Sequence, residues 1–173
     1  MLIKIFGSAI VLVSSTLIGL LMASKYKTRV RQLKEIRNSF QMIETEIFYT
    51  ATPIIEVVEK ISKRSPQPLC EVFDDISKNL KKREGESLGD IWRRAFERKK
   101  GYMAFIQEDL EVIYFFGSIL GTSDRQSQLK NAKLVQSQLL KLEEYAEREW
   151  MKNERLYRNL GILSGLAIII ILI

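Results

Sequence analysis

Apolar residues recur every three or four positions through the middle of the chain, a period typical of amphipathic α-helices. The first such series has the spacing of a heptad seam and consists of Leu33, Ile36, Phe40, Ile43 and Ile47. Comparable series follow at 54–61, 69–80, 88–96, 110–120 and 129–146. No segment shows the alternation expected of a strand. The pattern therefore predicts an all-α protein, an antiparallel bundle of about six helices.

Residues that favour helix termini separate these series. Thr52 is expected to cap the second helix and Pro53 to open it. Ser87, with Asp90 three residues later, forms a capping-box variant that predicts the start of the fourth helix. Ser123 begins a similar motif, and no proline follows it in the sequence. The last helix is therefore expected to run on to the end of the chain.

Two uncharged apolar segments flank this helical middle. Residues 5–23 form nineteen consecutive positions without a charge. At about 1.5 Å of rise per residue they can cross a hydrocarbon core of roughly 30 Å. Residues 160–173 form fourteen such positions, and they reach a marginal crossing length only if the segment is counted from Tyr157. We expect the first and last helices to extend into membrane anchors. The alternatives are a cleaved signal peptide and a buried core helix, respectively.

The distribution of charge sets the expected orientation. The chain carries 27 Lys and Arg against 21 Asp and Glu, and residues 25–37 alone hold six basic residues and one acidic residue. Such a cluster beside a membrane span favours the cytoplasmic side. We therefore predict an N-terminal transmembrane anchor at 1–24 with its N-terminus outside, a cytoplasmic bundle at 25–156 and a C-terminal membrane segment at 157–173. A surplus confined to one segment does not suggest nucleic-acid binding.

Four cations of this basic cluster are candidate contacts with the membrane surface, namely Lys25, Lys27, Arg29 and Arg31. A cation near an anionic membrane surface contributes about 1 kcal/mol to binding. We expect these side chains to hold the bundle against anionic headgroups.

Small residues lie at helical spacing in both apolar segments. Ser8, Ser15 and Gly19 form a stripe in the first, and Gly161 and Gly165 form a GxxxG step in the second. Small residues allow membrane helices to approach closely. They are candidates for membrane-helix packing, and pairing within one chain and pairing between subunits are equally permitted.

The composition removes the commonest catalytic and metal-site designs. The chain has no His and one Cys, so it lacks imidazole chemistry and cannot build a cysteine-cluster site. The Gly-containing string at 117–126 lacks the Gly-Lys-Ser/Thr of a phosphate-binding loop. Neither apolar segment carries an ionisable residue, which a membrane-embedded active site would be expected to show. We therefore expect no catalytic residue, no metal, no cofactor and no enzymatic activity.

Three separated strings carry a resemblance to a known family. They are QMIETEIFY at 41–49 followed by Thr52-Pro53, LGTSDRQ at 120–126 followed by QLK at 128–130, and NERLYRNLG at 153–161. In this order, and together with both apolar segments, they resemble the stage III sporulation protein AB family over essentially the whole chain. The 81–107 stretch adds nothing to the match.

The resemblance implies a membrane component of the channel apparatus that connects mother cell and forespore during endospore formation, with the bundle on the mother cell side. It also implies a cytoplasmic domain similar to the platform protein of type II secretion and type IV pilus machines. The expected partners are a secretion-type ATPase, stage III sporulation protein AA, and other channel subunits. It supplies no catalytic residues.

The surface that meets this ATPase is expected at the end of the bundle away from the membrane. Candidate partner-binding residues in its loops are Thr52, Pro53, Ser123, Asp124 and Arg125. We expect a bundle continuous with two anchors to pass a force or conformational change between a soluble motor and a membrane assembly.

Three other interpretations stay open at this point. One is a helical bundle secreted after signal cleavage. Another is an integral-membrane enzyme with a polar site between helices, although neither apolar segment carries the ionisable residue that such a site normally shows. The third is a membrane-anchored scaffold or signalling protein that dimerises through the helix at 25–50. Homo-oligomerisation is compatible with both the anchors and this helix.

Overall fold

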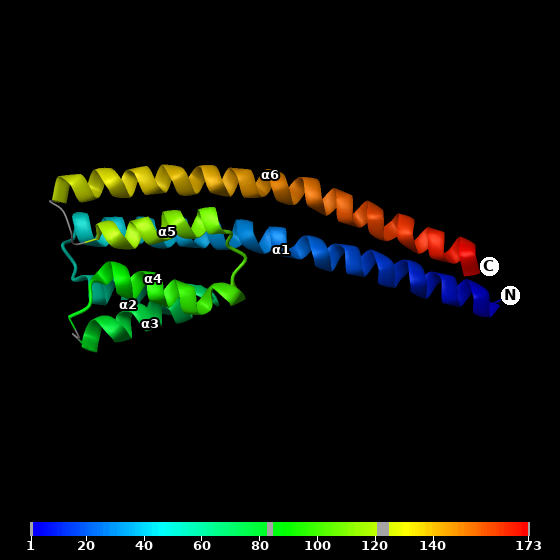
Figure 1. Cartoon of the computed structure of the whole chain (residues 1–173), viewed down its shortest axis with the longest axis horizontal. Helices are drawn as coiled ribbons and strands as arrows, with labels where there is room; N and C mark the ends of the chain where they lie inside the picture. The colour runs from blue at the N-terminus through cyan, green and yellow to red at the C-terminus, as the bar shows by residue number, and fades with distance from the viewer. Residues whose placement is uncertain (1, 83–84, 121–124, 173) are drawn as a thin grey trace. The chain divides into compact units, whose positions relative to one another are not determined.

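The computed structural model describes residues 2–82, 85–120 and 125–172, with side chains described at 6–8, 10–82, 85–120 and 126–171. Within these residues all regular secondary structure is helical, with loops between the helices, which confirms the predicted all-α fold (Figure 1). The elements are α1 (Leu2–Phe48), α2 (Ile54–Arg64), α3 (Leu69–Lys82), α4 (Leu88–Lys99), the short 3-10 helix η1 (Lys100–Tyr102), α5 (Gln107–Ile119) and α6 (Arg125–Leu172).

The chain divides into two compact units, each of which is described by itself. One unit combines Met1–Val30 with Tyr145–Ile173 and is called the helix pair below. The other is Arg31–Glu144 and is called the bundle. In the helix pair, the N-terminal part of α1 and the C-terminal part of α6 run side by side and antiparallel (Figure 1).

The bundle forms its core from the apolar series seen in the sequence. Each helix turns its apolar stripe inward, which removes that surface from water and supplies the main driving force for packing. The largest fully buried side chains include Leu33, Ile36, Phe40, Ile43, Ile61, Phe73, Ile76, Trp92, Phe96, Ile113 and Phe116.

Aromatic rings occupy the centre of this core. The rings of Phe40 and Phe116 stack with centroids 3.8 Å apart, which joins α1 to α5. Trp92 of α4 lies 5.7 Å from Phe40, and its Nε1–H donates to the carbonyl oxygen of Ile113 at 3.0 Å. This bond satisfies the one polar atom that the buried indole carries.

Polar contacts fix α6 against α1 within the bundle. The Arg37 guanidinium meets the Glu143 carboxylate at 2.8 Å. About two turns before Glu143 in α6, the Gln136 amide donates to the backbone oxygen of Arg37 at 3.4 Å. Ala132, Val135 and Leu139 are buried on the same helix, so an apolar seam and flanking polar contacts together define this pairing.

Helix starts agree with the sequence in one place and differ in another. Ser87 caps α4 and accepts from the backbone N–H of Asp90 at 3.2 Å, as predicted. Thr52 does not cap α2; Pro53 occupies the N-cap position, and no side chain caps the helix. The Thr52 hydroxyl donates instead to the Glu46 carboxylate at 2.7 Å. That carboxylate also forms an ion pair with Lys60 of α2. The Thr52 hydroxyl, which was expected to bond to the backbone of α2, therefore bonds to a side chain instead.

Candidate membrane-anchoring helix pair and partner-binding groove

The helix pair packs through small residues. A Cβ atom added to Gly19 would lie less than 3.0 Å from the carbonyl oxygen of Tyr157. One added to Gly161 would lie 2.8 Å from the carbonyl oxygen of Ser15, and one added to Gly165 would lie less than 3.0 Å from the Ser15 hydroxyl. These gaps are too small for any side chain, so the close approach of the backbones depends on glycine. The structure thus brings four of the five predicted packing residues together within one chain. The fifth, Ser8, is half-buried on α1.

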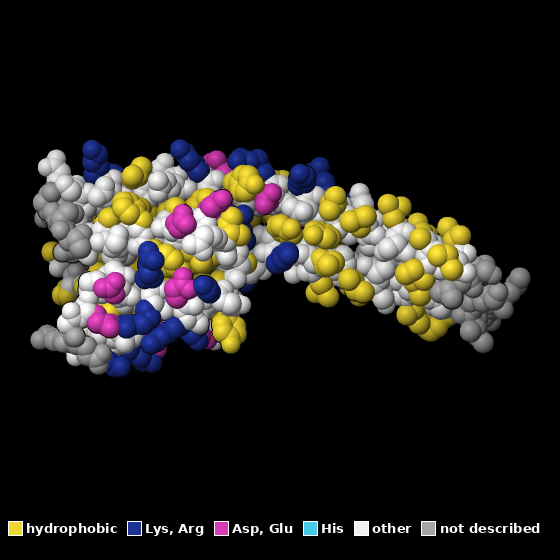
Figure 2. Space-filling view, in the orientation of Figure 1, with side chains coloured by type: hydrophobic (Ala, Val, Ile, Leu, Met, Phe, Trp, Pro, Cys, Tyr) yellow, Lys and Arg dark blue, Asp and Glu magenta, His cyan; other side chains and the backbone are white. Residues whose placement is uncertain are grey.

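Large apolar side chains point away from this seam. Gly19, Ala23, Gly161 and Gly165 are buried, whereas Leu21 is 70% exposed. Figure 2 shows apolar side chains over the surface of the helix pair. The exposed large residues include Phe6, Ile10, Val13, Leu17, Ile18, Leu21, Met22, Leu160, Leu163, Leu166, Ile168, Ile170 and Ile171. The arrangement is the reverse of a water-soluble helix pair, which buries its large apolar residues.

α1 is also the one helix, among the residues described, that is long and apolar enough to cross a membrane; the segment found begins at Phe6. Four aromatic residues among those described in the helix pair contact its basic residues or one another. Lys27 Nζ lies 5.5 Å from the centroid of the Trp150 ring. The rings of Tyr26 and Tyr157 are 6.2 Å apart.

The four predicted headgroup contacts do not share one environment. Lys25, Lys27 and Arg31 are exposed. Arg29 is only 5% exposed, and its guanidinium lies 6.0 Å from the centroid of the Tyr145 ring. The structure therefore corrects the prediction for Arg29, because a buried guanidinium does not face a membrane surface.

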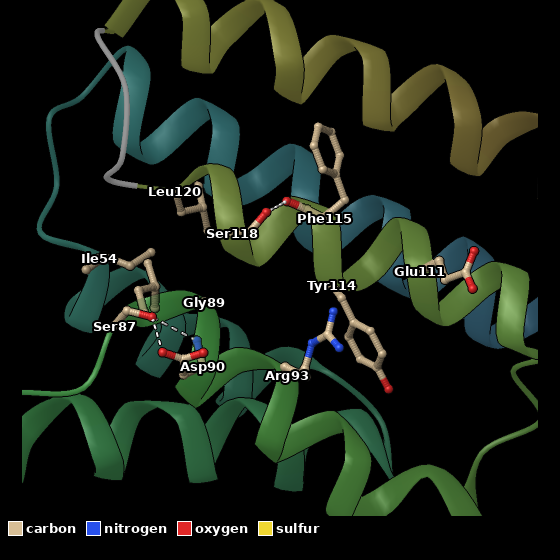
Figure 3. Close-up of a pocket in the computed structure, with 11 residues that line it drawn as sticks. Ile54, Ser87, Gly89, Asp90, Arg93, Glu111, Tyr114, Phe115, Ser118 and Leu120 are labelled. Carbon is tan, nitrogen blue, oxygen red and sulfur yellow. Dashed lines mark hydrogen bonds between the residues drawn. The ribbon is translucent and has the colours of Figure 1, made fainter.

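The bundle carries a groove between α4 and α5. It has a volume of about 830 Å³ and is lined also by Ile54 at the start of α2, by Ser87 before α4 and by Leu120 after α5 (Figure 3). The loop before α2, the loop before α4 and the end of α5 thus meet at one place. Of the candidate partner-binding residues, Pro53 is exposed and directly precedes the lining residue Ile54 in the sequence, and Thr52 is half-buried. Ser123 and Asp124, and the side chain of Arg125, lie outside the described residues.

Close helix packing forms the floor of the groove. A Cβ atom on Gly89 would lie 3.2 Å from the Cα of Ser118, so α4 and α5 nearly touch there. Phe115 of α5 lies at the rim of the groove and is 42% exposed, with its ring pointing away from α4 (Figure 3). In Figure 3 the Arg93 guanidinium lies against the Tyr114 ring, 4.8 Å from its centroid. The groove is therefore an apolar channel with charged edges.

Three comparisons relate this chain to known proteins. A family model described as stage III sporulation protein AB matches residues 4–173. The chain belongs to the stage III sporulation protein AB family. It is similar to "Stage III sporulation protein AB" of Bacillus subtilis (strain 168), at 33% identity over 170 residues, which cover 98% of this chain and 99% of the relative. A solved structure titled "Stage III sporulation protein AB (SpoIIIAB)" matches at 31% identity with a TM-score of 0.68, over 72% of this chain and 97% of its own.

In this family member a hydrogen-bonded pair, Tyr114 of α5 and Glu97 of α4, includes one residue of the groove lining. The Tyr114 hydroxyl donates to the Glu97 carboxylate at 2.7 Å. Burial, and next the bond to Glu97, raise the pKa of Tyr114, which keeps its hydroxyl protonated. Bonds from Lys100 first, and then from Tyr114, lower the pKa of Glu97. Both groups therefore hold fixed protonation states near neutral pH.

Ion pairs engage many of the carboxylates on the neighbouring surface. Glu59 meets Lys81 at 2.7 Å, which joins α2 to α3. Asp75 of α3 meets Arg98 of α4 at 3.4 Å. Among the described residues, no three His, Cys, Asp or Glu side chains are grouped so that they could hold a metal ion. These carboxylates connect helices in the bundle.

Sequence reasoning missed the groove and its residues. Gly89 and Phe115 lie on helices that were predicted, but the predicted stripes assigned neither residue to a site. Gly89 follows the capping serine and stands where α5 crosses α4. Glycine destabilises a helix by about 1 kcal/mol relative to alanine. A glycine within a predicted helix is therefore the signal that could have indicated a close helix crossing.

Proposed function

We propose that the protein is a non-enzymatic, membrane-anchored coupling subunit of the channel apparatus that connects mother cell and forespore during endospore formation. In this role it links a cytoplasmic secretion-type ATPase, stage III sporulation protein AA, to the membrane assembly and its other subunits. Membership of the family supports the sporulation role. The observation that carries the membrane part is the reversed polarity of the helix pair, with glycine inside and large apolar residues outside.

Lipid is the environment that suits this polarity. In water, the exposed side chains of the helix pair would form an apolar surface much larger than soluble proteins tolerate. In a bilayer the same side chains contact acyl chains, and close packing of small residues holds the helices together. We propose that both apolar segments cross the membrane as a hairpin, with the chain ends outside and the bundle in the mother cell cytoplasm.

The coupling role rests on the continuity of two helices. α1 extends over Leu2–Phe48 and α6 over Arg125–Leu172, and neither contains a proline. Each carries an apolar segment at one end and core residues of the bundle at the other. Proline is the commonest cause of a sharp helix kink, so its absence favours transmission of a displacement along each helix.

Dimerisation through the helix at 25–50 is less well supported as the main role. Leu33, Ile36, Phe40, Ile43 and Ile47 would form that dimer seam, but the first four are fully buried in the bundle and Ile47 is half-buried. A dimer that used them would have to open the core. Self-association through another surface remains compatible with the proposed role.

Binding to the ATPase is the direct test. The full chain in nanodiscs would be immobilised and exposed to purified stage III sporulation protein AA, with empty nanodiscs as the control. We expect saturable binding and a change in the ATPase rate on binding. If the two folded proteins show neither, the proposed coupling role is wrong.

A further inference from the structure

The α4–α5 groove combines an exposed apolar wall with carboxylates that have no ion-pair partner. Asp90 stands on the α4 wall and Glu111 on the α5 wall. Among the described residues neither has a Lys or Arg within ion-pairing distance, although the nearby Glu86 and Glu97 are paired with Arg94 and Lys100. Asp90 accepts only from the Ser87 hydroxyl, at 2.6 Å, and Glu111 has a contact of 3.5 Å with Gln107.

Arg93, the cation among the lining residues, has no ion pair with Asp90 or Glu111, but it keeps its positive charge inside the groove. Arg93 lies over the ring of Tyr114, where the face of the ring attracts it. It also helps to lower the pKa of Glu97, which lies beside Tyr114. The groove therefore presents one negative charge on each wall against the one positive charge of Arg93, and its apolar lining includes the exposed Phe115 and the half-buried Leu88 and Ile54.

We propose that this groove binds a basic amphipathic helix of a partner protein. The apolar face of such a helix would lie against Phe115, Leu88 and Ile54. Lysine or arginine residues on its two flanks would meet Asp90 on one wall and Glu111 on the other. An acidic or neutral helix would leave both carboxylates partly desolvated without a counter-charge. That costs affinity, so the groove should select a basic helix over an acidic one.

This inference rests on the proposed function only for the choice of partner, because the ATPase is the protein expected to supply the helix. Two measurements keep the claims apart. The first uses a synthetic helical peptide of about 18 residues, five turns long, with a leucine face flanked by lysines. The second uses the purified ATPase. Both employ the full chain in nanodiscs of zwitterionic lipid, with binding to empty nanodiscs subtracted.

Charge and apolar contact are tested by Glu111→Lys and Phe115→Ala. Their matched controls are Glu144→Lys and Leu134→Ala, which change an exposed carboxylate and an exposed leucine on α6. Each groove variant should weaken binding of the lysine peptide by roughly tenfold, whereas the controls should not. The same peptide with glutamate in place of lysine should not bind.

Equal binding of the lysine peptide to wild type and groove variants, or no binding to wild type, would overturn the groove proposal. If the peptide discriminates but the ATPase does not bind, the groove proposal stands and the proposed function falls. If the ATPase binds all variants equally, the ATPase uses another surface. A photo-crosslinker at position 115 that joins two copies of this chain, and nothing else, would assign the groove to self-association and also overturn the proposal.

Discussion

The Cα of Gly19 faces the backbone of Tyr157 so closely that a Cβ atom at position 19 would overlap the Tyr157 carbonyl oxygen. Backbone cannot move aside as a flexible side chain can, so Gly19→Ala should separate the two helices. Overpacking of this kind costs about 1–3 kcal/mol. Leu21 and Leu163 are exposed and can carry nitroxide labels. Double electron–electron resonance in nanodiscs should then show a longer and broader label-to-label distance distribution for Gly19→Ala than for the wild-type sequence.

Gly7 supplies the control for this prediction. A Cβ atom on Gly7 has no neighbour within 4 Å, and alanine favours a helix over glycine by about 1 kcal/mol. Gly7→Ala should leave the distance distribution unchanged. The same broadening in both variants would show that glycine flexibility, rather than close approach, governs the pair.

Gly117 plays the corresponding part in the bundle. A Cβ atom there would lie less than 3.0 Å from three atoms of the buried Trp92. Gly117→Ala should lower the free energy of unfolding by about 1–3 kcal/mol, measured by urea titration with circular dichroism. Gly101→Ala, where nothing lies within 4 Å, should change it by less than about 0.5 kcal/mol. Equal effects of the two substitutions would contradict the packing account.

The half-buried carboxyl group of Glu44 should make the free energy of unfolding of the bundle depend on pH. Burial raises the pKa of the Glu44 carboxyl, and the nearby Lys133 offsets this only in part. A raised pKa in the folded state means that the folded chain binds the proton more tightly, so ionisation costs stability as the pH rises through that pKa. Glu44→Gln should therefore unfold at higher urea than wild type at pH 8, and the difference should vanish below about pH 4.

Lys133→Gln tests the same relationship from the other partner. Lys133 attracts the ionised Glu44 carboxylate and so reduces the cost of its burial. Without this cation the variant should be less stable at pH 8 and regain stability as Glu44 takes up a proton. A loss that persists unchanged at low pH would show that Lys133 acts through packing and not through the charge of Glu44.

The exposed cations near the helix pair should recruit anionic lipid. Substituting Gln at Lys25, Lys27 and Arg31 should reduce the enrichment of fluorescent phosphatidylglycerol around the protein in mixed nanodiscs, because each cation contributes about 1 kcal/mol near an anionic surface. Gln at Lys63, Lys82 and Lys130, exposed residues of the bundle, is the matched control. Equal enrichment in the two triple variants would remove the lipid role.

The sequence was sufficient to predict elements whose signal is periodic. The spacing alone predicts the seam of Leu33, Ile36, Phe40, Ile43 and Ile47; the first four residues are fully buried, and Ile47 is half-buried. Ser87 was assigned as a cap because a hydroxyl three residues before a carboxylate can bond within one turn. Signals of this kind are local, so they do not depend on which helices meet.

Features that depend on partners distant in the sequence could not be predicted. Thr52 bonds to Glu46 rather than to the backbone of α2, and Arg29 is buried beside Tyr145. The groove arises because Gly89 and Ser118 come together. Each outcome is set by tertiary contacts that override a local preference, and one sequence carries no record of them.

The central claim is that the bundle lies in the cytoplasm between two membrane-crossing segments. In a Cys70→Ser background, single cysteines would replace Lys25 and Arg158, and a third would be added after Ile173. Labelling with a membrane-impermeant maleimide in right-side-out and inverted vesicles would then report the side of each position. The account predicts that positions 25 and 158 react only in inverted vesicles and the added cysteine only in right-side-out vesicles. Reaction of position 25 or 158 in right-side-out vesicles would contradict it.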